Sequence, residues 1–501
     1  MVQLWPADDE ALRAAGIAEA VCIIPVSSDD RLNLQIALKA RELNPKIRIV
    51  LRQFNRALGH KIEQNLADCS AISPAAHAAA TYAGASVDPA CVYALQFPDV
   101  DGPLVGFSER AAHDFGLRDT TVGEAERKLG VRVVTVNENV APERATPIRR
   151  DDRVVAFGPM ETLQHAWRRR RRTRPQLRRR REWLADMLRA AARYEPFLIY
   201  TFAFALLLFL AGSVYFTFQL HLSFVEAMYF TASTMFTVGY GDITPYNRHG
   251  GVLSLFVAMG IMVGGVTIAG IFIASIASAF SRAQETALQG LRRVRAEDHV
   301  VVCGAGNTGT RVIDFLLDMQ QRVVVLEQSP SSLVLELART RRVDLLTGDA
   351  TSDDTLEFCD LGSALSFVAV TDSDTSNLEA ALGALVQNPQ IPVVVRINDP
   401  DFSRLIERNF NIAKSFSASE LTAPMIAGLA RFPGTRGRVA FAGESFNVGV
   451  RSASDRLPRA EGTVPLYAWR AGKLRPIRDF AEMEPEDWLL YIVPLSQFKA
   501  E

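Results

Sequence analysis

Two long uncharged stretches divide the sequence, and a short glycine-rich segment lies between them. The stretches cover residues 196–220 and 250–281, and neither contains Asp, Glu, Lys or Arg. About twenty predominantly apolar residues suffice to cross the hydrocarbon core of a bilayer. The 501-residue chain is therefore expected to hold two transmembrane helices, over 196–218 and 251–280, inside an otherwise charged sequence.

The segment between the two stretches reads TVGYGD. Its residues are Thr237, Val238, Gly239, Tyr240, Gly241 and Asp242. A loop that points successive carbonyl oxygens at one axis is neither helix nor strand, and glycine reaches the positive φ values such a loop needs. TVGYG, repeated in four chains, lines a filter whose carbonyl oxygens replace the hydration shell of K⁺. The alternative, a chance glycine-rich turn, leaves the flanking spans unexplained.

Residues 196–281 resemble the two-helix pore unit of tetrameric potassium channels, and residues 223–236 (SFVEAMYFTASTMF) are similar to its pore helix. The resemblance implies K⁺ bound by filter carbonyls and a homotetramer, because one chain supplies a quarter of the carbonyl ring. Members of this family usually carry Thr or Ser just before the filter threonine, whereas this chain has Phe236. That departure puts the inner-cavity shape and blocker sensitivity in question.

The second apolar stretch is rich in glycine. Gly260 and Gly264 are four residues apart, a spacing that suits close packing between membrane helices. Glycine also lowers the cost of bending a helix, so either residue is a candidate gating hinge. Both interpretations stay open, and they are compatible with each other.

The soluble sequence contains an internal repeat with an offset of 344 residues and no gaps. Matched pairs include Leu12 with Leu356, Asn33 with Asn377, Asn44 with Asn388, Arg52 with Arg396, and Ser73 with Ser417. Both copies alternate short β-branched runs with amphipathic helices, which is typical of a parallel sheet. The repeat predicts one fold used twice, before and after the pore.

The second copy begins with the apolar run of residues 299–303, followed by a glycine-rich turn, a helix and a second strand that ends at Glu327. This order is the dinucleotide-binding fingerprint in its required context. The glycines permit a tight turn, the helix N-terminus faces a phosphate, and the acid accepts from a ribose hydroxyl. A Rossmann fold that has lost its ligand is the alternative.

This copy resembles the RCK domain (regulator of potassium conductance), which is also found as the TrkA-N domain of Trk-type uptake subunits. The resemblance implies a ring of RCK domains and a site for NAD(H) or an adenine nucleotide, favoured over NADP by the acid at 327. The implied nucleotide-binding residues are Gly304, Ala305, Gly306, Asn307, Thr308, Gly309, Glu327, Asp349, Ala350 and Thr371.

In the 344-residue register Met1 matches Leu345, so the first copy lacks the first strand, the glycine-rich loop and the second strand. Either the natural start lies upstream, or the copy is a degenerate half that packs on complete ones. Both interpretations predict no nucleotide site in residues 1–88. Residues 89–167 and 433–501 resemble the small β-rich subdomain that follows RCK domains, and neither shows a metal-ligand cluster.

Ten arginines lie among the fourteen positions from Arg168 to Arg181. So close to a span, they predict a cytoplasmic end that attracts anionic lipid, rather than a nucleic-acid site. Arg282, Arg292, Arg293 and Arg295 place the other end on the same side. The expected location is therefore the plasma membrane, with two spans and both termini cytoplasmic.

The remaining composition restricts the function further. Five scattered cysteines without CxxC spacing argue against a disulfide framework or a zinc site, and the acidic N-terminus does not resemble a signal peptide. No catalytic His, Lys or Arg constellation accompanies the fingerprint, which disfavours an NAD-dependent oxidoreductase. A Trk-like uptake subunit is the other alternative, but such pores carry four degraded filters in one chain.

The sequence thus predicts a ligand-gated, K⁺-selective channel and no enzyme activity. The fold class is a helical membrane pore with cytoplasmic Rossmann-like domains and small β-rich subdomains. The expected segments are a partial RCK domain (1–88), its small subdomain (89–167), an Arg-rich linker (168–195), the pore (196–281, with the pore helix at 223–236 and the filter at 237–242), a linker (282–298), a complete RCK domain (299–432) and its small subdomain (433–501).

Overall fold

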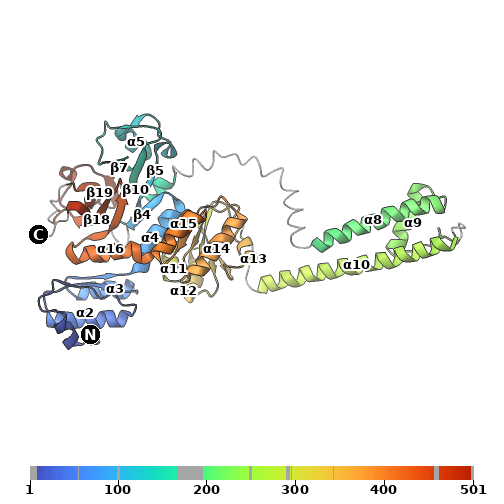
Figure 1. Ribbon diagram of the computed structural model, residues 1–501, viewed down its shortest axis with the longest axis horizontal. Helices are drawn as coiled ribbons and strands as arrows, with labels where there is room; N and C mark the ends of the chain where they lie inside the picture. Colours follow the sequence, from blue (N-terminus) through green and yellow to red (C-terminus); the bar gives the residue numbers. More distant parts are fainter. Residues whose placement is uncertain are drawn as a thin grey trace. The chain divides into compact units, whose positions relative to one another are not determined.

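The computed structural model describes residues 8–54, 56–98, 102–165, 196–246, 251–288, 294, 296–341, 343–455 and 462–497. The chain forms two compact units. One joins residues 1–173 to residues 291–501, and the other covers residues 174–290. Because the pore segment interrupts the first unit in sequence, that unit is built from the two ends of the chain (Figure 1).

The complete Rossmann domain holds a six-stranded parallel sheet in the order β13-β12-β11-β14-β15-β16. The strands are β11 (His299–Cys303), β12 (Arg322–Glu327), β13 (Asp344–Thr347), β14 (Ser366–Ala369), β15 (Val393–Arg396) and β16 (Lys414–Phe416). The helices are α11 (Asn307–Asp318), α12 (Ser332–Thr340), α13 (Asp353–Glu357), α14 (Asp374–Gln387), α15 (Pro400–Asn409) and α16 (Ala418–Arg431). This strand order is that of dinucleotide-binding folds, whose ligand crevice lies between the first and fourth strands.

The N-terminal copy reproduces the second half of that domain. Its elements are α1 (Asp9–Ala14), β1 (Cys22–Ile23), α2 (Asp30–Leu43), β2 (Arg48–Arg52), α3 (Arg56–Asn65), β3 (Cys69–Ile72) and α4 (Pro74–Val87). Its parallel sheet has the order β1-β2-β3, which corresponds through the 344-residue offset to β14-β15-β16. No counterpart of β11, β12 or β13 occurs among residues 8–54 and 56–98.

Buried asparagines repeat the same hydrogen bonds in both copies. The Asn33 side chain donates to the carbonyls of Ser27 and Arg52, at 2.8 and 3.0 Å. Asn377, 344 residues later, donates to the carbonyls of Thr371 and Arg396, at 3.0 Å each. Each amide therefore ties one strand end to the next, which explains why the asparagine recurs.

A small subdomain follows each copy, and the two have the same strand order. The first sheet runs β4-β5-β10-β7-β8 and the second β17-β18-β21-β19-β20. The first contains β4 (Cys91–Gln96), β5 (Leu104–Ala111), β6 (Thr120–Thr121), α5 (Val122–Leu129), β7 (Arg132–Val136), β8 (Asn139–Val140), β9 (Pro147–Ile148) and β10 (Arg153–Pro159). The second contains β17 (Thr435–Phe441), β18 (Glu444–Ser452), β19 (Val464–Arg470), β20 (Lys473–Pro476) and β21 (Trp488–Pro494).

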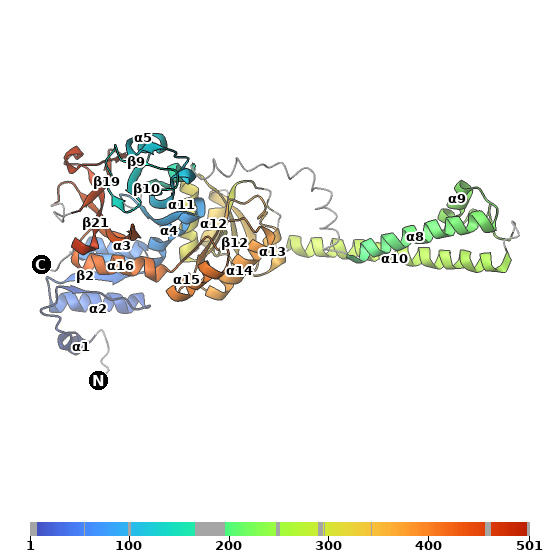
Figure 2. The same ribbon diagram turned by 45° about the horizontal axis from the view of Figure 1, so that its top comes forward.

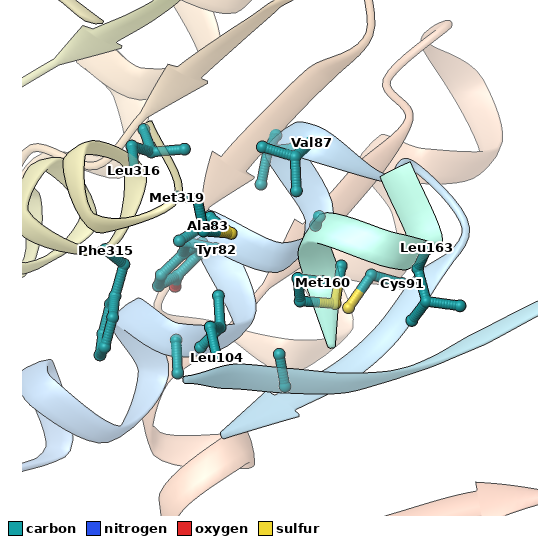
Figure 3. Packing of buried hydrophobic residues seen from close by; sticks show 14 of the residues in the cluster. Tyr82, Ala83, Val87, Cys91, Leu104, Met160, Leu163, Phe315, Leu316 and Met319 are labelled. Atoms are coloured by element: carbon teal, nitrogen blue, oxygen red, sulfur yellow. The ribbon is translucent and has the colours of Figure 1, made fainter. Parts of the chain in front are cut away.

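The two copies share one hydrophobic core. Tyr82 and Ala83 of α4 lie against Phe315, Leu316 and Met319 at the C-terminal half of α11 (Figure 3). The small residues of α4 let this helix approach α11 closely, and almost the whole length of α4 is buried. The Tyr82 hydroxyl donates to the Phe416 carbonyl at 2.9 Å. Both ribbon views show α4 and α11 side by side (Figure 2).

A partly buried charge cluster also joins the copies. Glu126 of α5 lies 2.8 Å from Arg132 of its own subdomain and 2.8 Å from Arg478 of the second subdomain. Arg478 also donates to the Pro142 carbonyl at 3.0 Å. The Glu126 carboxylate thus pairs with one arginine from each copy, and its removal would leave both guanidinium groups without this partner.

The second unit holds α8 (Pro196–Gln219), α9 (Phe224–Met235) and α10 (Gly251–Leu288). Among the described residues, α8 and α10 are the helices long and apolar enough to cross a membrane, over Tyr200–Gln219 and Gly251–Ser275. Within this unit α8 and α10 run side by side, and α9 packs on both (Figure 1). The α10 helix continues to Leu288, so part of the expected linker is helical.

Candidate functional site

The TVGYGD segment follows α9 directly. Ser223 caps α9 in a reciprocal arrangement with Glu226, which explains why the helix begins at residue 224 rather than 223. The helix ends at Met235, and residues 238–240 have no regular secondary structure. Two apolar helices therefore hold a short helix and an irregular segment, as the sequence predicts.

Backbone hydrogen bonds orient the segment. The N–H groups of Val238 and Gly239 both donate to the Ser233 carbonyl, at 2.9 and 3.2 Å, and the Thr237 N–H donates to the Thr234 carbonyl at 3.2 Å. In a trans peptide the C=O points opposite to the N–H. The donors face the C-terminal end of α9, and the carbonyls face away from it.

The sign of φ alternates along the segment. Thr237, Gly239 and Gly241 have φ of 57°, 56° and 79°, while Val238 and Tyr240 are not among the positive-φ residues. Alternating right- and left-handed conformations bring successive N–H groups to one side of the chain. The carbonyl oxygens then gather on the opposite side, where they can replace the water around a cation.

Aromatic residues pack at the C-terminal end of the segment. The Tyr240 ring stacks on Tyr229 of α9, with centroids 6.4 Å apart and planes 6° apart. The Asp242 carboxyl group lies near the Tyr229 hydroxyl. Tyr240 is 71% exposed and Val238 52% exposed in the single chain. Both side chains therefore belong to the exposed surface beside the irregular segment.

The glycines of α10 have different surroundings. A Cβ at Gly264 would lie 2.8 Å from Leu208 of α8, and one at Gly265 would lie 2.0 Å from the Met235 carbonyl oxygen. Gly260 has nothing within 4 Å of the corresponding position. Gly264 thus packs closely, and α10 is unbroken at both candidate hinges. No packing role was assigned to Gly265 from the sequence, although its place beside Gly264 was a signal.

The predicted nucleotide loop lies at the carboxyl end of β11, in a cavity of about 520 Å³. Gly304 has φ of 89°, and a Cβ there would be 2.9 Å from the Thr371 nitrogen. Gly306 precedes α11 without a side-chain cap, whereas Ser331, Ser373 and Ser417 cap α12, α14 and α16. The N-terminus of α11 is therefore open to an anion.

The remaining candidate residues surround the same cavity. Besides Gly304, Gly306, Asn307 and Thr308, the lining includes Glu327, Asp349, Ala350 and Thr371. Glu327 accepts from the Ala305 nitrogen at 2.6 Å, and its other oxygen accepts from the Ser329 nitrogen at 3.1 Å. Ala305 and Gly309 are not among the lining residues, and Gly309 packs against the loop instead. The ends of β11 and β12, which carry the predicted loop and Glu327, thus meet at one cavity.

Two candidate residues already have local structural roles. Asp349 accepts from the nitrogen and hydroxyl of Thr351, and these hydrogen bonds lower the pKa of its carboxyl. The Thr371 hydroxyl donates to Asn377 at 2.7 Å. The Thr371 N–H also donates to the Asn377 side chain at 2.8 Å, and the Ser27 N–H donates to the Asn33 side chain at 2.8 Å in the first copy. Because this backbone hydrogen bond recurs in both copies, it belongs to the fold itself.

Arg396 is a cavity residue that sequence reasoning did not assign. It lies at the end of β15, lines the cavity, and pairs with Asp372 at 2.8 Å. Its position at the carboxyl edge of the sheet was the signal that could have identified it. The predicted lipid-binding arginines, Arg168–Arg181, lie outside the described residues. Within the described ranges, no three His, Cys, Asp or Glu side chains are placed to share a metal ion.

Known families match both parts of this geometry. The TrkA-N domain matches residues 1–74 and 300–416, and the ion channel family matches residues 203–282. The chain combines TrkA-N domains with an ion-channel domain. The predicted fold class, a two-helix pore with Rossmann-like domains, is confirmed.

Individual relatives are similar to part of this chain. Potassium channel protein 1 of Methanocaldococcus jannaschii is 29% identical over 182 residues, 35% of this chain and 54% of that protein. The voltage-gated potassium channel Kch of Escherichia coli is 26% identical over 209 residues, 41% of this chain and 48% of Kch. The chain spans about half the length of these relatives. The crystal structure of the GsuK RCK domain aligns with 99% of this chain and 83% of that chain, at a TM-score of 0.47 and 13% identity.

Proposed function

We propose that this protein is a K⁺-selective channel that conducts passively through a homotetrameric pore. The observation that carries the proposal is the anchoring of the Val238 and Gly239 N–H groups on Ser233, which leaves the filter carbonyls on the opposite side. Two relatives named as potassium channels support it. Four copies complete the carbonyl ring and cover the exposed Val238 and Tyr240 side chains.

The first unit constrains the topology of the proposed channel. Residues before and after the pore share one core, through Tyr82 with Leu316 and through Glu126 with Arg478. This shared core supports a topology in which the described residues before and after the pore lie on the same side of the membrane. Two crossings, over α8 and α10, give this topology. The arginines at 168–181 favour the cytoplasmic side of the plasma membrane and contact with anionic lipid.

We also propose that NAD(H) or an adenine nucleotide binds at residues 304–309 and sets the open probability. The residues fit such a group, because α11 lacks a side-chain cap and a side chain at Gly306 would meet nothing within 4 Å. The N–H groups at the start of α11 would hold phosphate, and Glu327 would accept from a ribose hydroxyl. A ligand can shift gating only through different affinities for the open and closed states of the RCK ring.

The test is a bilayer recording of the purified protein in asymmetric K⁺ and Na⁺. A reversal potential near the K⁺ equilibrium value is expected, and Gly241→Ala should abolish K⁺ preference because residue 241 has φ of 79°. Gly270→Ala is the matched control on α10, because nothing lies within 4 Å of a Cβ there. Currents with equal K⁺ and Na⁺ permeability in the unmodified protein would refute the channel proposal.

The gating proposal needs its own comparison. NAD⁺, NADH, ATP and ADP are added to the cytoplasmic side, and open probability is recorded for the unmodified protein and for Gly306→Val. Valine fits the extended backbone at 306 and fills the space next to the helix N-terminus. A nucleotide response that is lost in Gly306→Val is expected. An open probability that ignores all four nucleotides would refute gating and leave the pore proposal intact.

A further inference from the structure

A second cavity, of about 950 Å³, lies where the two copies meet. Its walls come from α3, β3, α4 and β4 of the first copy, and from α11, α16, β17 and β19 of the second. The residues that give it its chemistry are Glu63, His77, Arg311, Phe315, Arg436 and Trp469. Nothing in the proposed channel mechanism uses this space, although it falls within the size range of ligand sites.

The described lining residues carry a net positive charge at neutral pH. Arg311 and Arg436 are cations, and the nearest acid of Arg311 is Asp314, at 3.5 Å. Within the described part of the chain, Arg436 forms no ion pair. Burial, together with Arg436, lowers the pKa of His77 to about 4, so its ring is neutral. Glu63, the carboxylate in the lining, has one oxygen bound to the Ala71 nitrogen at 2.8 Å.

Flat apolar surfaces accompany these cations. Trp469 of β19 and Phe315 of α11 both line the cavity, together with Met425 of α16. Aromatic side chains of this kind stack on planar ligand rings, and arginine forks bind phosphate or carboxylate groups. Because the lining combines charged and aromatic side chains, it differs from that of a dry apolar cavity.

We propose that this cavity is a second ligand site, for an organic anion that joins a planar ring to phosphate groups. Arg311 and Arg436 hold the anionic groups, and Trp469 contacts the ring. The site is distinct from the loop at 304–309, yet both lie on α11. Asn307 and Thr308 line the first cavity, and Arg311 and Phe315 line the second. A ligand in one cavity therefore contacts the helix whose N-terminus forms the other.

The test counts ATP molecules bound per chain by equilibrium dialysis of the full-length protein in detergent. The unmodified protein should bind two, and Gly306→Val should bind one. Arg311→Gln combined with Arg436→Gln should also bind one, with affinity at the second site reduced at least tenfold. Arg438→Gln is the matched control, because Arg438 is exposed on the same strand as Arg436 and does not line the cavity.

Two further variants make the result specific. Trp469→Leu should weaken the ATP that persists in Gly306→Val and leave the loop site unchanged. Adenosine should displace that ATP poorly, because it has a ring and no phosphate. One ATP per chain that disappears in Gly306→Val alone would overturn the second site, and so would two ATP per chain in the double arginine variant. Because binding is measured without ion flux, this outcome is independent of the channel proposal.

Discussion

Gly309 of α11 lies directly against the carbonyl oxygen of Gly304, and a Cβ at residue 309 would be 1.8 Å from that oxygen. The first turn of the helix is thereby held under the loop that ends β11. Gly306, between them, faces open space. The two glycines therefore have different roles: Gly309 permits close packing, and Gly306 leaves space beside the helix N-terminus.

Gly309→Ala should destabilise the first unit by more than Gly306→Ala does, although alanine is also a poorer N-cap than glycine at residue 306. The added methyl at 309 meets backbone that cannot move aside, and overpacking of this kind costs about 1–3 kcal/mol. Thermal unfolding followed by far-UV circular dichroism measures the difference. Equal unfolding midpoints for the two variants would contradict the close contact of helix and loop.

Gly265→Ala should abolish K⁺ flux, and Gly260→Ala should preserve it. The methyl at 265 would lie 2.0 Å from the Met235 carbonyl oxygen, at the C-terminus of the helix that anchors the filter segment. Displacing that end moves Ser233, which accepts from Val238 and Gly239. Flux assays in proteoliposomes compare the two variants. Normal K⁺ flux in Gly265→Ala would show that the close contact between Gly265 and the C-terminal end of α9 is not needed for conduction.

Glu126→Gln should lower the free energy of unfolding by about 3 kcal/mol at pH 7, because two arginines lose their carboxylate. Burial raises the pKa of Glu126, but hydrogen bonds from Arg478 and Arg132 outweigh it and lower the pKa overall. A carboxyl group with a lowered pKa in the folded state stabilises the fold fully at pH values above its unfolded-state pKa of about 4.3. This stabilisation is lost as the pH falls through the folded-state pKa. The difference between variant and parent should therefore shrink below about pH 4.

Urea unfolding at pH 7 and pH 3.5 measures this linkage. Glu138→Gln, at an exposed position of the same subdomain, is the control and should follow the parent at both pH values. If the difference in free energy of unfolding between Glu126→Gln and the parent stays constant with pH, the ionised Glu126 carboxylate does not stabilise the contact between the copies.

Phe236→Thr should keep K⁺ selectivity. The filter backbone is anchored on the carbonyls of Ser233 and Thr234, and the Phe236 side chain is 72% exposed in the single chain. The substitution should instead change sensitivity to blockers that enter the inner cavity. Reversal potentials and blocker dose–response curves separate the two effects. A shift of the reversal potential toward the Na⁺ value would show that residue 236 shapes the filter itself.

Local sequence signals identified much of the architecture. Uncharged length predicted α8 and α10, and the glycine spacing after β11 predicted the loop and helix. The repeat predicted β1 to β3 from β14 to β16, and the recurring bonds of Asn33 and Asn377 give the physical reason. These features depend on residues within one element or its neighbours, so composition and spacing are sufficient to reveal them.

Contacts between distant parts of the chain were not predictable in the same way. Tyr82 and Leu316, or Glu126 and Arg478, are separated by hundreds of residues and carry no mutual spacing signal. The same holds for Arg311, which resembles any exposed helical arginine until α3, β17 and β19 are placed beside it. The predicted roles of Asp349 and Thr371 in binding likewise omitted the local hydrogen bonds that both residues form.

The shared core of α4 and α11 also sets an order of events during synthesis. The ribosome produces residues 1–165 first, when the partner surface of Tyr82 and Ala83 has not yet been made. That surface, on α11, emerges only after both membrane helices have left the ribosome. The first unit can therefore be completed only after residues 174–290 have been made, and only if the residues before and after them lie on the same side of the membrane. A chain inserted with one end on the wrong side would expose the apolar face of α4 to quality-control proteases.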